Sequence, residues 1–300
     1  MLRSLKVTDE SPQVNGFVVV DKESGWTSHD VVARIRKKLN TRKVGHSGTL
    51  DPPATGLLIL GVGRATRLLK FITDLPKCYT ATMILGKETT TLDAEGEITD
   101  IQDPSAICLE DLQKAASNYL GETLQIPPMV SAVKVGGKRL YEIAREGKEI
   151  DRQPRPVTIF DLTIATTIEK NVYELDVTCG SGTYIRSLVS DIAKDAGTIA
   201  YVGDLRRSSV GSFTETDANP IEEIKVIGMT EGLRDYPHIK VNQSDVSSIQ
   251  VGKVFEKSHF DLKELPEPWV FTDDQGKLLA IYKQHKGGTI KPDVVIPTDT

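Results

Sequence analysis

Short apolar runs in the first two thirds of the chain predict β-strands. Residues 16–20 are β-branched and lead into a turn composition, and residues 57–62 are apolar throughout, as in a buried strand. Residues 78–85 alternate between apolar and polar side chains, the period of a strand with one buried face. Residues 157–166 and 172–179 flank a short polar segment and predict a hairpin.

Helical spacing occurs between these strands. Val31, Val32, Ile35 and Leu39 fall on one face of a helix for which Ser28 is the expected N-cap. The remaining expected elements are helices over 64–73, 109–119, 137–146 and 183–196, the last followed by Gly197 in the left-handed position, and a strand over 199–213. Because helices and strands do not alternate strictly, the pattern favours an α+β fold with a mixed, largely antiparallel central sheet flanked by helices.

The pattern changes beyond an acidic stretch near residues 214–235. Short strand-like pieces separated by polar turns follow, over 252–255, 269–272, 278–282 and 293–296. A stretch of about 65 residues is just large enough to hold its own core. We therefore expect a larger domain over residues 1–235 and a small β-rich domain over residues 236–300.

Composition narrows the class of protein. The chain has 300 residues, 39% of them hydrophobic, and no run approaches the ~18 apolar residues that a membrane span needs. Residues 1–12 are polar and lack the apolar stretch of a signal peptide. Cys78, Cys108 and Cys179 are too few and too scattered for a disulfide framework or a zinc ribbon. We expect a cytoplasmic protein without membrane contact.

The formal net charge of −5 is unevenly distributed. Residues 211–300 hold 10 basic and 15 acidic side chains, so the preceding part of the chain is neutral. Within that neutral part, residues 34–43 contain six basic side chains and no acidic one. A local basic face of this kind can bind phosphate whatever the overall charge. A solvated helix face accounts for the same segment equally well.

The glycine- and proline-rich segment Gly45–Gly56 is the densest in candidate chemistry. A rigid loop between helix and strand can hold a reactive side chain in place. Asp51, restrained by the following Pro52, could be a nucleophile or a general base. The alternative is an Asx-type turn in which Asp51 only bonds its own backbone. His46 is a lone loop histidine without a His or Cys cluster beside it, so no metal is expected.

Other motifs are weaker. Gly180–Gly182 lacks the third glycine of a dinucleotide fingerprint, and Gly61–Arg64 lacks the Lys-Ser/Thr of a phosphate loop. Asp93–Glu97 fits a turn better than a calcium loop. Arg186 would keep a neighbouring carboxylate ionised. Nothing in the spacing brings it to Asp51, however, and a surface arginine is the alternative.

Taken together, six blocks closely resemble the bacterial tRNA pseudouridine-55 synthases in order and in rough spacing. They are GFVVVDKESGWTS (16–28), GHSGTLDPPATGLL (45–58), KCY (77–79), LGKETTTLDAEG (85–96), QIPPMVSAVKVGGKRLYEIAR (125–145) and CGSGTYIRSL (179–188), with LRR (205–207) downstream. The resemblance covers about residues 14–215 and implies the pseudouridine synthase fold. Residues 236–300 match the family's small PUA-like RNA-binding domain in size and position.

The resemblance also implies a reaction and its residues. A uridine in the T-loop of tRNA is isomerised to pseudouridine: the base leaves ribose C1′, turns and is reattached through C5, without a cofactor. Asp51 is then the essential carboxylate, Arg186 pairs with it, and Tyr79 packs on the base and helps to remove the C5 proton. The implied substrate-binding residues are His46, Lys22, Tyr184, Leu205 and Arg67.

The implied partner is the T stem-loop of tRNA, whose target uridine must be flipped out before a side chain can reach its sugar. Loop shape, phosphates and stacked bases then carry recognition. Candidate phosphate contacts are the basic residues of 34–43, 134–155 and 206–207. An ionised Asp51 suits a nucleophile that attacks C1′ and equally a base that takes the C2′ proton to give a glycal. We expect a monomer that needs no protein partner.

Some positions depart from the common family pattern, and two alternatives to this enzyme remain. Glu23 stands where a proline is usual, and Ser181 where a lysine is frequent. The acidic C-terminal region weakens the case for strong charge-driven RNA binding by that domain. One alternative is an enzyme directed by guide RNAs and partner proteins, which would be expected to carry a fuller, more basic C-terminal domain. The other is a non-enzymatic RNA-binding protein that uses the same surface.

Overall fold

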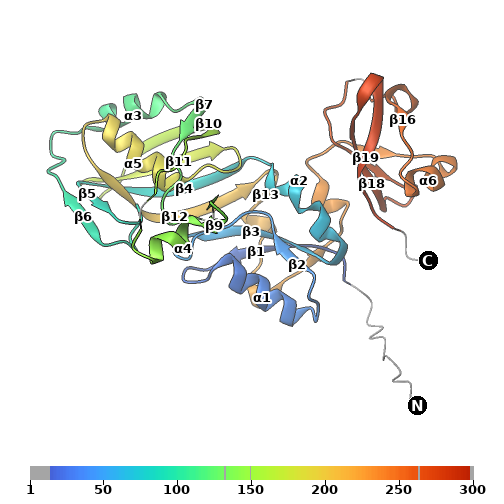
Figure 1. Ribbon diagram of the computed structural model, residues 1–300, viewed down its shortest axis with the longest axis horizontal. Coiled ribbons are helices and arrows are strands. Elements are labelled where there is room, and N and C mark those ends of the chain that lie inside the picture. Colours follow the sequence, from blue (N-terminus) through green and yellow to red (C-terminus); the bar gives the residue numbers. More distant parts are fainter. Residues whose placement is uncertain (1–13, 132, 149, 263, 298–300) are drawn as a thin grey trace, which may run out of the picture.

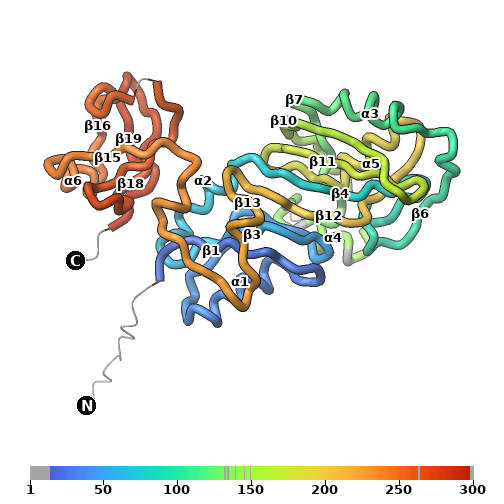
Figure 2. Tube along the Cα trace, turned by 180° about the vertical axis from the view of Figure 1, so that it is seen from behind, coloured from blue at the N-terminus to red at the C-terminus, as the bar shows by residue number. Residues whose placement is uncertain are grey.

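The computed structural model describes residues 14–297, except for residues 132, 149 and 263 (Figure 1). A large mixed sheet with helices packed on it forms the main body. A smaller sheet of C-terminal residues lies at one end of the long axis, as the view from behind also shows (Figure 2).

The large sheet has the strand order β14-β1-β3-β12-β4-β11-β10-β7. In chain order its strands are β1 (Gly16–Lys22), β2 (Val44–His46), β3 (Thr55–Val62), β4 (Lys77–Leu85), β7 (Gly121–Gln125), β10 (Arg155–Thr166), β11 (Val172–Cys179), β12 (Ala200–Val210), β13 (Phe213–Thr214) and β14 (Val226–Ile227). β12 runs parallel to β3, and the other neighbours in this order pair antiparallel. The expected mixed, largely antiparallel sheet is confirmed.

Helices pack on this sheet and connect its strands. They are α1 (Ser28–Lys38), the 3-10 helix η1 (Gly63–Leu68) continued by α2 (Leu69–Thr73), α3 (Leu109–Ser117), α4 (Leu140–Arg145) and α5 (Ile185–Asp195). Met83, Leu175 and Ile164 of the central strands are buried in one core cluster with the apolar faces of α3 and α5. Among the helices described, none is long and apolar enough to cross a membrane.

Short hairpins and turns complete the main body. They are β5 (Lys87–Thr89) with β6 (Ile98–Ile101), β8 (Lys134–Val135) with β9 (Lys138–Arg139), and the 3-10 helices η2 (Glu215–Asp217), η3 (Ile221–Glu223) and η4 (Glu231–Leu233). The helix expected over 137–146 is shorter than the pattern indicated, because β9 takes its first residues. The segment that lies between β7 and β10 in the chain is thus a small hairpin followed by one short helix.

The expected N-cap of α1 is wrong by one residue. Thr27 caps the helix: its hydroxyl accepts from the Asp30 amide at 3.0 Å, and the Asp30 carboxylate accepts from the Thr27 amide at 3.0 Å. Ser28 is buried instead. Its hydroxyl accepts from the Leu50 amide at 2.9 Å and donates to the Leu50 carbonyl at 3.1 Å. Ser28 therefore ties α1 to the loop that carries Asp51.

The C-terminal sheet has the order β15-β17-β18-β19-β16. Its elements are β15 (His238–Lys240), α6 (Gln243–Gln250), β16 (Phe255–Glu256), the 3-10 helices η5 (Lys257–Phe260) and η6 (Lys286–Gly288), β17 (Trp269–Thr272), β18 (Leu278–Gln284) and β19 (Thr289–Val295). The β-rich character is as expected, but the pattern missed α6. Only Val246 and Ile249 are apolar in that helix, too few for a helical period to stand out.

The two sheets share one apolar cluster. It contains Phe71, Leu75 and Leu233 of the main body together with Val270 and Ile281 of the C-terminal sheet. Beside it, Lys70 Nζ lies 2.7 Å from Asp293 Oδ1 on β19. The C-terminal sheet is therefore packed directly on α2.

Gly56, at the start of β3, meets two constraints at once. Its φ is +98°, and a Cβ there would lie 2.3 Å from the carbonyl oxygen of Arg207. We expect Gly56→Ala to lower the free energy of unfolding by at least about 3 kcal/mol. The matched control is Gly121→Ala, where φ is +86° but nothing lies within 4 Å, so only backbone strain of about 1–2 kcal/mol is expected. Urea denaturation followed by circular dichroism measures both, and equal losses would contradict the close contact.

Candidate active site

A cavity of about 260 Å³ opens beside the centre of the large sheet. The loop from Ser47 to Asp51, the start of β4, residues 181–186 and Leu205 and Arg207 of β12 form its walls. The volume lies just below the range of about 300–1,000 Å³ that is typical of small-molecule sites. In the described part of the chain, no group of three or more His, Cys, Asp or Glu side chains is arranged to hold a metal ion.

Lys22, at the end of β1, fixes the cavity loop. Its ammonium is buried and donates to the carbonyl oxygens of Glu23 at 3.0 Å, Trp26 at 2.8 Å and Pro52 at 3.1 Å. Burial lowers the pKa of Lys22 to about 8, and the Asp51 carboxylate opposes that shift. The expectation that Lys22 binds substrate is corrected, because its side chain has no exposed surface and its donors are engaged by backbone.

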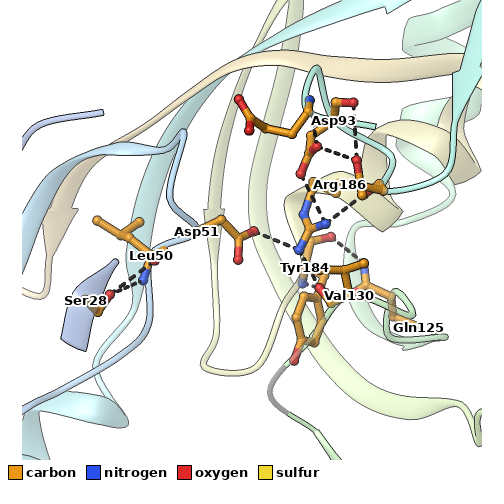
Figure 3. Close-up of polar contacts among 10 residues, drawn as sticks. Ser28, Leu50, Asp51, Asp93, Gln125, Val130, Tyr184 and Arg186 are labelled. Carbon is orange, nitrogen blue, oxygen red and sulfur yellow. Dashed lines mark hydrogen bonds and ion pairs between the residues drawn. The ribbon is translucent and has the colours of Figure 1, made fainter. Parts of the chain in front are cut away.

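Asp51 and Arg186 form the ion pair that the resemblance implied (Figure 3). Arg186 Nη2 lies 2.8 Å from Asp51 Oδ2. The arginine side chain is 4% exposed and the aspartate 34%, so the carboxylate stays accessible from the cavity while the guanidinium is enclosed. Of the alternatives left open by spacing, the surface arginine is wrong. The self-bonded Asx turn is also absent from the described contacts of the Asp51 carboxylate.

Three further oxygens hold the Arg186 guanidinium. Nη1 lies 3.2 Å from Asp93 Oδ2 and donates to the Thr91 carbonyl at 2.7 Å. Nη2 donates to the Val130 carbonyl at 2.9 Å. Asp93 is itself buried and accepts from the Thr91 hydroxyl and, at 3.1 Å, from the Glu95 amide. The guanidinium thus lies between two carboxylates, one accessible and one buried.

The sequence pattern did not reveal the role of Asp93. It indicated a turn over Asp93–Glu97, and a turn is present there. The sequence of a turn that is capped by its own carboxylate does not show whether an arginine from a distant helix also contacts that carboxylate. The place of Asp93 within the block LGKETTTLDAEG was the one available signal.

Tyr79 and Arg207 lie opposite each other on β4 and β12, and both line the cavity. Arg207 is 1% exposed. Its Nη1 donates to the Tyr79 hydroxyl at 3.4 Å, its Nε to the Leu57 carbonyl at 2.7 Å and its Nη2 to the Gly48 carbonyl at 3.3 Å. Burial raises the pKa of Tyr79, and the Arg207 cation opposes that rise. The expected phosphate contact of Arg207 is wrong, because this side chain does not reach the surface.

Two of the other expected binding residues line the cavity. Tyr184 and Leu205 belong to its wall. Tyr184 precedes α5, and the Gln125 side chain holds its backbone by donating to its carbonyl at 3.0 Å and accepting from its amide at 2.8 Å. His46 lies on β2, just before the cavity loop, with its ring 5.5 Å from that of His29. Burial lowers the pKa of His46, and His29 adds to that effect.

Arg67 and Arg206 are engaged away from the cavity. Arg67 Nη1 donates to the Val295 carbonyl at 3.0 Å, so this side chain joins the main body to the C-terminal sheet. Arg206 Nη2 lies 3.0 Å from Asp21 Oδ2, and its Nε lies beside a Glu215 carboxylate oxygen. The structure does not bring Arg67 to the other expected site residues. The guanidinium that was expected to meet phosphate at position 206 is already shared by two carboxylates.

Comparisons with known proteins agree with one another. Residues 36–185 match the family model described as TruB family pseudouridylate synthase (N terminal domain). A protein named tRNA pseudouridine synthase B from Listeria innocua is 39% identical over 94% of this chain and 98% of its own. One of the same name from Staphylococcus aureus is 37% identical over 94% of this chain and 99% of its own.

Solved structures support the fold independently. The crystal structure of a Cbf5-Nop10-Gar1 complex contains a chain that superposes with a TM-score of 0.69 at 23% identity, covering 94% of this chain and 85% of that one. At this identity the likeness shows the fold alone, and it agrees with the expected pseudouridine synthase fold. Because relatives more than 30% identical match nearly the whole chain, the protein belongs to the TruB family of pseudouridylate synthases.

Proposed function

We propose that this protein isomerises the uridine at position 55 in the T-loop of tRNA to pseudouridine, and that it does so without a cofactor, a guide RNA or a protein partner. The observation that carries the proposal is the ion pair of the accessible Asp51 with the enclosed Arg186 at a cavity that Tyr79 also lines. The relatives named tRNA pseudouridine synthase B support tRNA as the substrate. We expect the chain to act as a cytoplasmic monomer.

The substrate must enter the cavity as a single extruded nucleotide. A uridine in a structured loop is stacked, and flipping it out of the stack costs a few kcal/mol. The cavity of about 260 Å³ offers a buried aromatic side chain, Tyr79, on which a base can pack. Leu205 adds an apolar contact on the same wall. Stacking and exclusion of water thus compensate for the lost loop contacts.

Asp51 has to be ionised for either chemical route. In one route its carboxylate attacks C1′ and displaces the base. In the other it removes the C2′ proton, and the base leaves as a glycal forms. In both routes the Arg186 guanidinium lies beside this carboxylate, with Nη2 2.8 Å from Oδ2. The geometry fits each route, and both begin with the same two residues.

Recognition of the rest of the tRNA rests on exposed basic side chains. In α1, Lys38 and Arg34 both contact Glu222. Lys38 donates to the backbone carbonyl of Glu222, and Arg34 Nη2 lies 3.9 Å from the Glu222 carboxylate. Lys37 and Lys43 are exposed. They have no hydrogen bond or ion pair through their side chains among the described residues. These free cations are suited to phosphate contacts, which position an RNA without reading its sequence.

The direct test uses purified protein with an unmodified tRNA transcript and no other component. We expect pseudouridine, mapped by chemical labelling, at a single T-loop uridine. Tight binding without product would instead favour a guide-dependent enzyme or a binding protein. Product at several unrelated sites would contradict the proposed substrate.

Asp51→Asn is expected to abolish turnover. The amide keeps the shape of the side chain but can neither attack C1′ nor accept a proton from C2′ at a useful rate. tRNA affinity should stay within a few-fold of the wild-type value, because the substitution removes one charge but leaves the shape of the cavity wall unchanged. The control is Asp176→Asn, which changes an exposed carboxylate on β11 that accepts from Thr80. Pseudouridine formation by Asp51→Asn at the wild-type rate would refute the assignment.

Asp93→Asn should slow turnover by about 100-fold while tRNA binding is kept. Without the buried carboxylate, the Arg186 guanidinium loses one of its two charged partners and its orientation toward Asp51 relaxes. A misplacement of about 1 Å in a catalytic group is sufficient for a loss of this size. Single-turnover rates and filter-binding affinities, measured on the same preparation, separate the two quantities. A loss confined to tRNA affinity would argue against this role.

Lys37→Ala should weaken tRNA binding and reduce the salt dependence of the binding constant by about one unit of slope. Lys37 lies in the last turn of α1. Lys170→Ala is the control, since this exposed lysine lies in the turn between β10 and β11. Binding constants measured over a range of salt concentrations give both slopes. If the slope for Lys37→Ala equals that of the wild type, α1 does not contact the RNA backbone.

A further inference from the structure

Arg207 is a buried cation without a carboxylate partner. Its side chain is 1% exposed. Its donors go to the Leu57 and Gly48 carbonyls and to the Tyr79 hydroxyl. None of the described carboxylates forms an ion pair with it, in contrast to Arg186, which lies between two of them.

A buried charge without an oppositely charged partner lowers the stability of the fold. Removing such an ion from water costs several kcal/mol after relaxation, and hydrogen bonds to neutral oxygens offset only part of this desolvation free energy. In a poorly hydrated site, the field of the cation acts strongly on the atoms that it faces. Two of the three acceptors of Arg207 are backbone carbonyls, whose charge is fixed. The third is the Tyr79 phenol, whose charge can change.

The fold places these two side chains together by strand pairing. Tyr79 of β4 and Arg207 of β12 are direct partners in an antiparallel pair, so their side chains lie on the same face of the sheet. The guanidinium carbon is 5.9 Å from the centroid of the Tyr79 ring, and Nη1 is 3.4 Å from its hydroxyl oxygen. Contacts of this length commonly shorten when a substrate closes the site.

The other ionisable groups that face Tyr79 act in the opposite direction. Burial is the main cause that raises the pKa of this phenol, and the Cys179 thiol of β11 and the Asp51 carboxylate of the cavity loop raise it further. Arg207 lowers it, both through its charge and through its hydrogen bond. Among these neighbours, Arg207 is the group that favours the phenolate.

We propose that Arg207 is a positioning residue that stabilises Tyr79 as the phenolate which takes the C5 proton in the last step of the reaction. The inference rests on the proposed function. In that reaction Tyr79 accepts the C5 proton, and the inference adds Arg207 as the positive charge that stabilises its phenolate. After C5 has bonded to C1′, the C5–H bond breaks and its proton forms an O–H bond with the phenolate. The electron pair of C5–H forms the C5=C6 double bond. The electrons of the C6=N1 double bond move to N1, which takes a proton from water.

The first test is a titration of Tyr79 in the free protein. NMR of isotope-labelled tyrosine, with Tyr79→Phe to assign the signal, gives the pKa directly. Arg207→Gln should raise that pKa by roughly 1–3 pH units, the range for the loss of an opposite charge at this separation. Arg207→Lys keeps the cation and should restore most of the difference. An unchanged Tyr79 pKa in Arg207→Gln would overturn the proposal.

The second test reads the proton-transfer step itself. The phenolate fraction falls tenfold for each pH unit by which the pKa rises, so Arg207→Gln should slow single-turnover pseudouridine formation about 10–1,000-fold at neutral pH. With tRNA carrying 5-deuterated uridine, the deuterium isotope effect should be larger than in the wild type. A merely structural loss would slow the reaction and leave the isotope effect at its wild-type size, which would overturn the proposal.

Arg234→Gln is the matched control. It removes another arginine that lies over an aromatic ring, 4.0 Å from the centroid of Phe213, but that is paired with Asp217 away from the cavity. It should leave both the Tyr79 pKa and the isotope effect at their wild-type values. If Arg234→Gln changed them as much as Arg207→Gln does, loss of any arginine beside an aromatic ring would explain the effect. That result would refute a specific role for Arg207.

If Arg207→Gln does not fold, a titration of the wild-type protein tests the proposal instead. The guanidinium signals of Arg207 should shift with the same midpoint as the Tyr79 titration, and signals that do not respond would overturn the proposal. The titrations also separate the two levels of inference. If the wild-type protein made no pseudouridine, the proposed function would fail, whereas the Tyr79 pKa would still decide whether Arg207 controls its ionisation.

Discussion

The site depends on one enclosed guanidinium. Arg186, at the start of α5, binds oxygens from three separate segments of the chain: the loop of Asp51, the turn of Thr91 and Asp93, and the carbonyl of Val130. A buried charge destabilises the fold unless well-placed oxygens accept its hydrogen bonds. Each of these segments is therefore held at the position from which its oxygen reaches the guanidinium. The interaction that positions the Asp51 carboxylate therefore also determines where its loop, the turn and Val130 come together.

Polar side chains buried against backbone give the rest of the site its rigidity. Lys22 collects three carbonyls around the cavity loop, and Ser28 binds both backbone groups of Leu50. These contacts replace the hydrogen bonds that a loop without regular structure would otherwise make with water. Asp51 is thereby held between two fixed points, the buried end of β1 and the first turn of α1.

Local patterns predicted most elements and drew attention to the loop that lines the cavity, but not the contacts between distant segments. The alternation over 78–85 gave β4, and the glycine–proline composition drew attention to Asp51. Thr27 rather than Ser28 was identifiable as the cap, because Asp30 completes a capping box three residues later. The pairing of Arg207 with Tyr79 spans 128 positions and follows from the register of β12 on β4. Local periodicity does not specify that register. The expectations that Lys22 binds substrate and that Arg207 contacts phosphate likewise did not reveal that both side chains are buried.

The apolar cluster shared by the two sheets connects the acidic C-terminal part to the cavity through contiguous contacts. The cluster packs on α2, and the carbonyls of Thr73 and Leu75 at the end of that helix both bind the buried ammonium of Lys77, each at 2.7 Å. Lys77 begins β4, two residues before Tyr79. Continuous packing and hydrogen bonds thus connect the C-terminal sheet, through α2 and Lys77, to the strand that carries the phenol. The inner face of the C-terminal sheet is therefore part of the support beneath the cavity, whether or not its outer surface meets RNA.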